Sequence, residues 1–331
     1  MESRRNEYLR EWRPGNTLAV GGTARCVLMV REAVAKIIVQ RYCERGQPLP
    51  PHEFTVCRLL KRGDPCRDAD LIVDMFEWYP DTPNPGECTI LMPRANDDLC
   101  RWIERRCRDP NGAFYTPDER LLRHIFLELA KAVAFMHSGS DFQHHRCPGF
   151  VHRDIKPGNV LVFTDPDDPD LPALRLADLG SAREVGASRS SDGEDAESIF
   201  TPGYSPPEFG YGRSWTTDCD VFSLGATIHY CAFRRTPYIK LEDTVAGLSD
   251  HHMGGSVLEP VSLRGRGWRE GRDGPVLSFS DGFADILAST LSEDPDRRPS
   301  AAELVEILGQ LRPGRPKQVV SRQVKPEPEW V

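Results

Sequence analysis

Three polar residues lie within six positions of one another in the stretch VHRDIKPGNVLVF, residues 151–163. Asp154 carries a carboxylate, Lys156 an ammonium group and Asn159 an amide, and apolar runs flank the three on both sides. A carboxylate can take up a proton, so such a set could perform chemistry. Asp, Pro, Gly and Asn are also ordinary turn residues, and a polar turn before a strand needs no function. Partners elsewhere in the chain must decide between these interpretations.

The first part of the chain, residues 16–87, has the pattern of a strand-rich region with one helix. Two β-prone runs, 27–30 and 33–39, are separated by only two residues, which predicts a tight hairpin between them. Two later runs have the same character. The expected strands are therefore 27–30, 33–39, 70–80 and 87–93.

A lysine lies in the second of these strands. Side chains alternate along a strand, so Val34, Lys36 and Ile38 are expected to share one face. A lysine on that face either extends along a sheet edge or points into a cleft. The helix expected at 52–62 places Glu53 on an otherwise apolar stripe, at spacings of four and three residues.

The second half of the chain is mainly helical in pattern. A helix at 116–137 is expected to begin with Thr116 as N-cap and Glu119 completing a capping box. A second capping box at Ser300 opens a C-terminal helix. The segment 312–331 is rich in proline and charge, which predicts a disordered tail. The buried stripe expected on the first of these helices is Leu122, Phe126, Leu129, Val133 and Met136.

Composition limits the class of protein. The chain has 331 residues, 39% of them apolar, and a formal net charge of −8. That charge argues against general nucleic-acid binding, which usually needs a basic face. No apolar run approaches the ~18 residues of a membrane span. We therefore expect an acidic protein that binds neither nucleic acid nor membrane.

The ten cysteines include no C-x-x-C pair, and no secretory segment opens the chain. We expect reduced thiols in a cytoplasmic and/or nuclear protein. His144, His145 and Cys147 could meet on a metal ion, but their segment supplies no fourth ligand. A solvated surface loop is the favoured interpretation of residues 138–149.

The stretch 151–163 resembles the catalytic loop of eukaryotic protein kinases, H-R-D-x-x-x-x-N. The sequence Ala-Asp178-Leu-Gly resembles the metal-binding D-F-G motif of that family, with Leu in place of Phe. Residues 205–208, SPPE, resemble its A-P-E motif. AVAKII around Lys36 resembles V-A-I-K, and Glu53 falls in a helix where the family places the partner of that lysine. Five matches in the family's order, each on the expected element, favour function over the turn interpretation.

The resemblance implies an α+β, two-lobed protein-kinase fold. It has a small antiparallel sheet with one helix in the first lobe and a larger, mainly helical second lobe. The expected boundaries are an N-terminal extension at 1–15, a kinase domain at 16–311 with lobes at about 16–93 and 96–311, and the tail at 312–331.

The family's chemistry implies roles for these residues. By resemblance, Lys36 would hold the α- and β-phosphates of ATP, and Glu53 would hold the lysine. Asn159 and Asp178 would bind magnesium, which prefers oxygen ligands. The other residues that the resemblance places around the nucleotide are Val20, Gly22, Val27, Val34, Met92 and Leu161.

By the same resemblance, Asp154 would accept or orient the proton of the substrate hydroxyl. Lys156 marks serine/threonine kinases in this family and would approach the γ-phosphate. Thr201, seven residues before Glu208, matches the serine/threonine form of the loop that seats the substrate. Phosphoryl transfer passes through a loose transition state, so positioning and charge neutralisation are the main tasks of such residues.

Other matches are structural or regulatory. Asp220 and Gly225 resemble the anchor of the long helix in the second lobe, and Arg298 resembles the buried partner of Glu208. Arg153 belongs in this family to a pocket for a phosphorylated residue. Glu197 stands in the corresponding position of this chain and could supply a fixed negative charge there.

The sequence also departs from the family. Only Gly22 of the glycine-rich loop pattern is in place, and Arg25 stands where a glycine lets the backbone approach phosphate. Three functions remain open. The first is a monomeric serine/threonine kinase acting with ATP and Mg²⁺ on a protein substrate, the second is a pseudokinase scaffold or allosteric binding module, and the third is a small-molecule phosphotransferase.

Overall fold

The structure is a computed structural model of the whole chain, and it divides into two compact units. The smaller comprises residues 1–58 and 73–95, and the larger comprises 59–72 and 96–331. We treat each unit by itself. The residues that the structure describes are 13–20, 25–30, 33–61, 67–112, 114–142, 145–165, 168, 170–187, 201, 203–208, 215–237 and 279–311.

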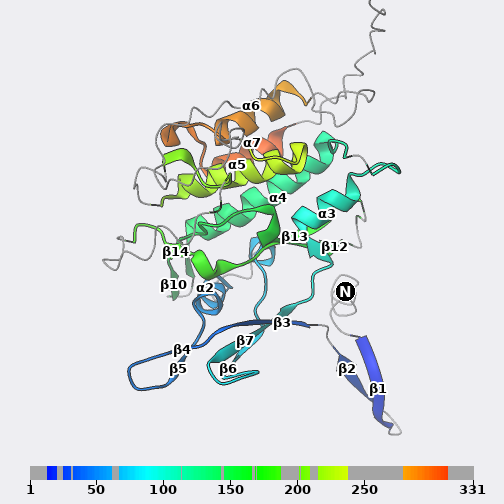
Figure 1. Cartoon of the computed structure of the whole chain (residues 1–331), viewed down its shortest axis with the longest axis vertical. Coiled ribbons are helices and arrows are strands. Elements are labelled where there is room, and N and C mark those ends of the chain that lie inside the picture. Colours follow the sequence, from blue (N-terminus) through cyan, green and yellow to red (C-terminus); the bar gives the residue numbers. More distant parts are fainter. Residues whose placement is uncertain are drawn as a thin grey trace, which may run out of the picture. The chain divides into compact units, whose positions relative to one another are not determined.

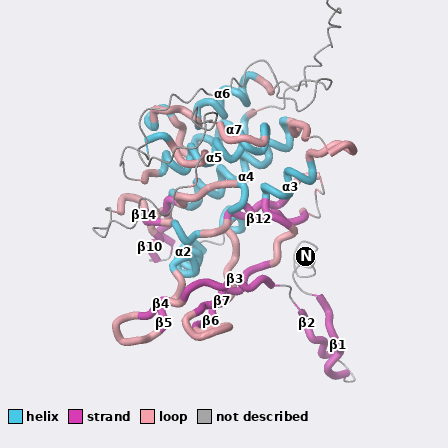
Figure 2. The backbone as a smooth tube through the Cα atoms, viewed as in Figure 1, coloured by secondary structure: helices cyan, strands magenta, loops and turns pink. Residues whose placement is uncertain are grey.

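The smaller unit is built from short antiparallel ladders (Figure 2). Its central sheet has the order β3-β7-β6, and β1 pairs with β2 and β4 with β5. The strands are β1 (Arg13–Val20), β2 (Arg25–Val30), β3 (Ala33–Val39), β4 (Arg41–Tyr42), β5 (Pro48–Leu49), β6 (Glu77–Pro80) and β7 (Glu87–Pro93).

The predicted hairpin between 27–30 and 33–39 is wrong for the residues that the structure describes. Both strands exist, but β2 pairs with β1, and every residue of β3 has its partner on β7. Alternation of apolar residues determines which face of a strand is buried, whereas the identity of its neighbour depends on distant segments. The apolar pattern therefore predicted the strands but not which strands pair.

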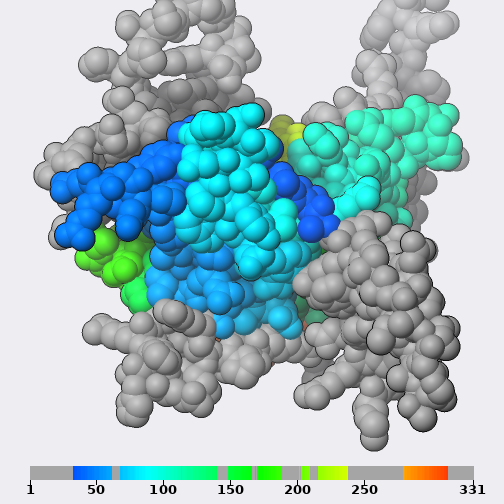
Figure 3. Space-filling model, turned by 90° about the horizontal axis from the view of Figure 1, so that it is seen from below, coloured from blue at the N-terminus to red at the C-terminus, as the bar shows by residue number. Residues whose placement is uncertain are grey.

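The alternation predicted for β3 is visible in its burial. Lys36 and Ile38 are half-buried, whereas Ile37 and Val39 between and beyond them are 50% and 80% exposed. Val34, near the start of the strand, is 42% exposed. Figure 3 shows the part of the surface to which β3 and its neighbouring strands belong. Lys36 thus lies on the more buried face of the sheet.

The strand predicted at 70–80 is only partly present. Residues Glu77–Pro80 form β6, but Arg67–Leu71 form a 3-10 helix, η1, and Ile72 makes a single parallel bridge to Leu176. Ile72 and Val73 are fully buried. Their apolar character reflects burial of a connecting segment, which a short apolar run cannot distinguish from a strand.

The helix predicted at 52–62 is confirmed as α2 (His52–Lys61). Its predicted stripe is buried, with Glu53 at 4%, Cys57 at 1% and Leu60 at 3% exposure. The Cys57 thiol donates a hydrogen bond to the carbonyl oxygen of Val73 at 3.3 Å. A carboxylate on a buried stripe needs a cationic partner, because an isolated buried charge is costly.

The larger unit contains the other described helices (Figure 1). Helix α4 packs against α5 and α7, and α5 packs against α6. Helix α5 is buried over almost its whole circumference, which is typical of a central helix. The helices are α3 (Leu99–Arg106), α4 (Glu119–Ser138), α5 (Thr217–Phe233), α6 (Asp281–Thr290) and α7 (Ala301–Gln310).

The predicted start of α4 is wrong by two residues. Asp118 is the N-cap, and its side chain accepts a hydrogen bond from the backbone N–H of Leu121 at 2.8 Å. Asp is as good an N-cap as Thr. Glu119 does not close a capping box with Thr116, because its carboxylate accepts hydrogen bonds from the N–H and hydroxyl groups of Ser280.

Two other predictions for these helices are confirmed. All five residues of the apolar stripe predicted on α4 are at most 1% exposed. Ser300 and Glu303 form the predicted capping box of α7. Gly225 of α5 allows close packing, since a Cβ atom there would lie 2.2 Å from Oγ1 of Thr290.

Short strands complete the larger unit. A sheet of order β13-β12-β8 lies next to α3 and α4, and β11 pairs with β14. The segment predicted as a solvated surface loop contains a small β9–β10 ladder, since backbone pairing needs no apolar pattern. The strands are β8 (Asp97–Asp98), β9 (Ser140–Phe142), β10 (His145–Cys147), β11 (Phe150–Val151), β12 (Val160–Thr164), β13 (Pro172–Leu176) and β14 (Arg183–Glu184).

Several predictions concern residues outside the described part of the chain. They are the placements of Gly22 and Glu197, and the tail at 312–331. Within the described part, no helix has the length and apolar character that crossing a bilayer requires.

Candidate active site

In the smaller unit, Lys36 and Glu53 form an ion pair. Lys36 lies on β3 and Glu53 in the first turn of α2, and Nζ of the lysine is 2.6 Å from Oε2 of the glutamate. The glutamate side chain is 5% exposed and the lysine side chain 31%. The pair satisfies the charge on the buried stripe of α2 and fixes the direction of the lysine. The two residues that the sequence joined across seventeen positions are therefore in contact.

In the larger unit, the carboxylate of Asp154 receives hydrogen bonds from three side chains. Nζ of Lys156 lies 3.0 Å from Oδ1 and 2.7 Å from Oδ2. The hydroxyl of Thr201 donates to Oδ1 at 2.7 Å, and Nδ2 of Asn159 donates to Oδ2 at 2.8 Å. Lys156 also donates to Oγ1 of Thr201 at 3.1 Å. Lys156 and Asn159 of the opening motif and the distant Thr201 thus converge on the carboxylate of Asp154, which is 14% exposed.

Asp220 of α5 holds the segment that carries Asp154. Its buried carboxylate accepts hydrogen bonds from the backbone N–H groups of His152, at 2.7 Å, and Arg153, at 2.9 Å. Arg153 has a left-handed backbone, with φ of 75°. Such a conformation is unfavourable for a side-chain-bearing residue and persists only when its surroundings fix it. The anchor therefore determines the direction in which Asp154 leaves the core.

His152 links this segment to the one before Asp178. It is fully buried, its Nε2 lies 3.0 Å from the carbonyl oxygen of Ala177, and its Nδ1 accepts from the N–H of Asp154 at 3.3 Å. A carbonyl oxygen can only accept, so His152 carries its proton on Nε2. The ring therefore bridges two backbones.

Asn159 and Asp178 lie beside two adjacent strands. Asn159 immediately precedes β12, and Asp178 comes shortly after the end of β13. The ladder between β12 and β13 pairs Val160 with Leu176, and the N–H of Ala177 donates to the carbonyl oxygen of Asn159 at 2.8 Å. Asp178 then turns into a left-handed conformation, with φ of 62°. Two residues separated by nineteen positions are thereby brought to the same end of one sheet.

The donor chemistry of Asn159 and Asp178 fits a magnesium ion. Asn159 uses its amide nitrogen toward Asp154, so its side-chain oxygen is the atom that a cation would contact. Among the described residues no three His, Cys, Asp or Glu side chains cluster as metal ligands. Magnesium needs no such cage, because it is usually bound by one or two protein oxygens together with phosphate oxygens and water.

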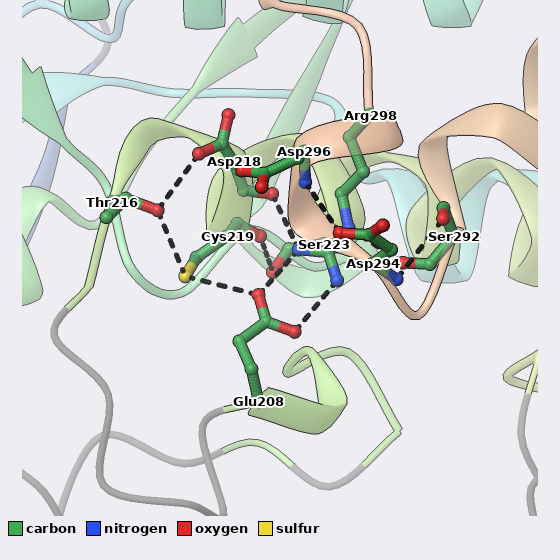
Figure 4. Close-up of polar contacts among 9 residues, drawn as sticks. All are labelled: Glu208, Thr216, Asp218, Cys219, Ser223, Ser292, Asp294, Asp296 and Arg298. Carbon is green, nitrogen blue, oxygen red and sulfur yellow. Dashed lines mark hydrogen bonds and ion pairs between the residues drawn. The ribbon is translucent and has the colours of Figure 1, made fainter.

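Glu208 and Arg298 form the buried ion pair that the sequence indicated (Figure 4). Two guanidinium nitrogens contact the two carboxylate oxygens at 2.6 and 2.8 Å. Arg298 also donates to the carbonyl oxygens of Asp218 and Ser292, and its guanidinium lies 5.0 Å from the ring centre of Phe222. The pair joins the segment after Thr201 to the start of α5 and the loop before α7.

The remaining predicted nucleotide residues are placed as follows. Val34 on β3 is paired with Met92 on β7, and both side chains are at least partly accessible. Leu161 on β12 is half-buried. Val20 ends β1 and Val27 lies in β2, where it is paired with Thr17.

Some contacts at the site could not be read from the sequence. Nε2 of His137, at the end of α4, lies 2.9 Å from Oδ2 of Asp220. The guanidinium of Arg153 lies 5.5 Å from the ring centre of Trp215, close enough for a cation–π contact. No local motif marks either residue, because each acts across more than sixty positions of chain.

Comparison with known proteins shows the family to which the chain belongs. The family model described as protein kinase domain matches residues 18–307. The chain therefore belongs to the protein kinase family.

Its similarity to individual kinases is low. It is 24% identical over 289 residues to "Ribosomal protein S6 kinase alpha-2" of Mus musculus, which covers 87% of this chain and 34% of that protein. It is 27% identical over 257 residues to "Serine/threonine-protein kinase Nek1" of Toxoplasma gondii, or 76% of this chain and 14% of that protein. It is 28% identical over 192 residues to "Ribosomal protein S6 kinase alpha-6" of Danio rerio, which covers 57% of this chain and 23% of that protein. The chain thus spans about a third or less of the length of these relatives.

Proposed function

We propose that this domain is a serine/threonine protein kinase that transfers the γ-phosphate of MgATP to hydroxyl groups of proteins. The observation that carries the proposal is the convergence of Lys156, Asn159 and Thr201 on the Asp154 carboxylate. A carboxylate held by fixed donors is oriented for one task, the positioning of a substrate hydroxyl. The Lys36–Glu53 pair supports the proposal, because it fixes an ammonium group for phosphate binding.

The roles follow from the chemistry of each group. Bound MgATP supplies the phosphoryl group and, through its metal ion, neutralisation of the phosphate charge. Asp154 would orient the substrate hydroxyl and accept its proton at a carboxylate oxygen. Lys156 would stabilise negative charge that builds up during transfer. Asn159 and Asp178 would hold the magnesium ion through side-chain oxygens.

The proposal extends to the setting of the enzyme. We propose a monomer that acts in the cytoplasm and/or nucleus on a protein substrate. The seven cysteines whose side chains the structure describes are free thiols, which is typical of a reducing compartment.

The decisive experiment measures transfer of labelled phosphate from MgATP to generic protein substrates. Wild-type protein should show transfer that Asp178→Asn, Lys36→Met and Asp154→Ala each lower by about 10²-fold or more. Circular dichroism should show all three variants folded. Absence of transfer above the Asp178→Asn level, together with no thermal shift on adding MgATP, would favour a binding module without catalysis.

A further inference from the structure

A second cluster lies on the two helices that pack against the catalytic loop. Helices α3 and α5 both contact the turn η2 (Pro157–Asn159), which ends at the predicted magnesium ligand. Glu104 projects from α3 and Arg234 caps the end of α5, and the two side chains form an ion pair. The glutamate side chain is 37% exposed and the arginine side chain 17%. This carboxylate is therefore near the surface but already occupied by a cation of the same chain.

Ring contacts connect Arg234 to Tyr204, in the segment after Thr201. Its guanidinium lies 4.5 Å from the ring centre of Tyr230 and 5.6 Å from that of Phe114. Tyr230 lies 6.1 Å from Tyr204, which follows Thr201 by three residues. Since Thr201 donates a hydrogen bond to Asp154, a peptide with its hydroxyl at Asp154 would have neighbouring residues close to these aromatic rings.

The segment after Thr201 is seated closely and carries no charge before Glu208. Gly203 has a φ of 84°, and a Cβ atom there would lie 2.6 Å from Cγ2 of Thr236. The described residues between Thr201 and Glu208 are glycine, tyrosine, serine and proline. They offer no carboxylate to bind an arginine or lysine of the substrate.

The other acidic residues next to α3 are paired in the same way. Asp98 contacts Arg101, with Nε and Oδ2 3.4 Å apart, and Asp97 contacts Arg105. Those arginine side chains are 75% and 67% exposed. Although the whole chain is acidic, the most exposed charged side chains of this helix are those of its arginines. A basic peptide would meet like charge here and would have to displace an arginine to reach a carboxylate.

We infer that Arg234 masks Glu104, so that the domain selects substrates with uncharged residues around the acceptor hydroxyl and discriminates against basic ones. The inference rests on the proposed kinase function, which makes this surface a binding site for the substrate. One ion pair carries the specificity. Glu104 is the acidic residue of α3, and its partner Arg234 contacts Tyr230, which in turn contacts Tyr204. Removal of the arginine should expose a carboxylate and reverse the preference.

The backbone of Arg234 supplies a suitable variant. Its φ is 57°, a left-handed value at the end of a helix, where glycine is the preferred residue. Arg234→Gly removes the guanidinium and relieves the backbone, so thermal unfolding should stay close to that of the wild type. Arg234→Gly combined with Glu104→Gln is the matched control, since it lacks the carboxylate that the single variant exposes.

The experiment uses serine peptides in an alanine and glycine background, with one arginine or one glutamine placed at each position around the serine. In the wild type, arginine should not improve kcat/KM over glutamine at any position. In Arg234→Gly, arginine at one or more positions should raise kcat/KM roughly 10-fold, and the double variant should lose that gain. Failure of the single variant to gain an arginine preference, or a wild-type preference abolished by Glu104→Gln alone, would overturn the inference.

Binding separates this inference from the proposed function. Fluorescence anisotropy with labelled arginine and glutamine peptides tests the same three proteins without any transfer. If no variant transferred phosphate, the proposed function would fail. A tighter binding of the arginine peptide by Arg234→Gly alone would still support masking by Arg234, and equal binding by all three would refute it.

Discussion

The hydroxyl of Thr201 donates a hydrogen bond of 2.7 Å to Oδ1 of Asp154, across forty-seven positions of sequence. The contact ties the segment that precedes Glu208 to the loop that carries Asp154. Thr201 contacts Oδ1 of the carboxylate, whereas Asn159 contacts Oδ2. The carboxylate is therefore held from two sides by groups of different elements.

The Thr201 contact predicts a clear difference between two substitutions. Thr201→Ser keeps the hydroxyl and should retain most of the turnover. Thr201→Val keeps the shape but loses the hydrogen bond to a charged group, which should lower turnover about 10- to 100-fold. Steady-state kinetics with the same peptide check this. Equal turnover of the two variants would show that the hydroxyl does not orient Asp154.

The buried pair of Glu208 and Arg298 predicts a loss of stability. Arg298→Ala leaves the glutamate buried without its partner, which costs roughly 3–5 kcal/mol. Urea unfolding should show this as a lower midpoint. The neighbouring Arg297, whose side chain is 80% exposed, is a matched control, and Arg297→Ala should change the free energy of unfolding by less than about 0.5 kcal/mol. Similar midpoints for the two alanine variants would contradict the role of the pair.

Two glycines in helices predict opposite effects of the same substitution. Gly225→Ala places a methyl group against Thr290, so we expect destabilisation of about 1–3 kcal/mol or failure to fold. Gly309 in α7 is exposed and has nothing within 4 Å of a Cβ position. Gly309→Ala should therefore stabilise by roughly 0.5–1 kcal/mol through helix propensity. Thermal unfolding of both variants tests the pair, and a shift in the same direction would refute the packing argument.

His229 predicts a dependence of stability on pH. Burial lowers the pKa of its imidazole from 6.5 to about 4. Nδ1 donates to the carbonyl oxygen of Arg235 at 2.9 Å, whereas the buried Nε2 has no acceptor, so a second proton is unfavourable. Because the pKa is depressed in the folded state, the unfolded chain binds a proton first as pH falls below 6.5. Stability due to the neutral ring is present above that pH and is lost between pH 6.5 and 4, by roughly 3 kcal/mol.

His229→Asn tests this loss of stability. The amide can donate in place of Nδ1 but does not titrate. Urea unfolding at pH 7, 6, 5 and 4 should give a shallower decline for the variant than for the wild type. Parallel declines would show that other groups control the acid response.

The sequence indicated some parts of this molecule far better than others. The grouping of Lys156 and Asn159 with Asp154 could be anticipated because the three lie in one loop, and the stripe of α4 because the helical period is a local property. The pairing of β2 with β1 could not be anticipated, because several strands were equally suitable partners. Nor could the choice of Asp118 over Thr116 as N-cap, because both residue types cap helices well. Glu104 and Arg234 form an ion pair across 130 positions, beyond the reach of any local pattern.

The separation between Glu208 and Arg298 also bears on how the chain is made. The pair joins residues ninety positions apart, and Glu119 holds Ser280 across 161 positions. A growing chain that has passed Glu208 therefore carries an unpaired carboxylate in a developing core until Arg298 leaves the ribosome. During that interval the larger unit lacks the Glu208–Arg298 contact, and apolar surface on its helices α4 and α5 is more exposed to chaperones or to aggregation.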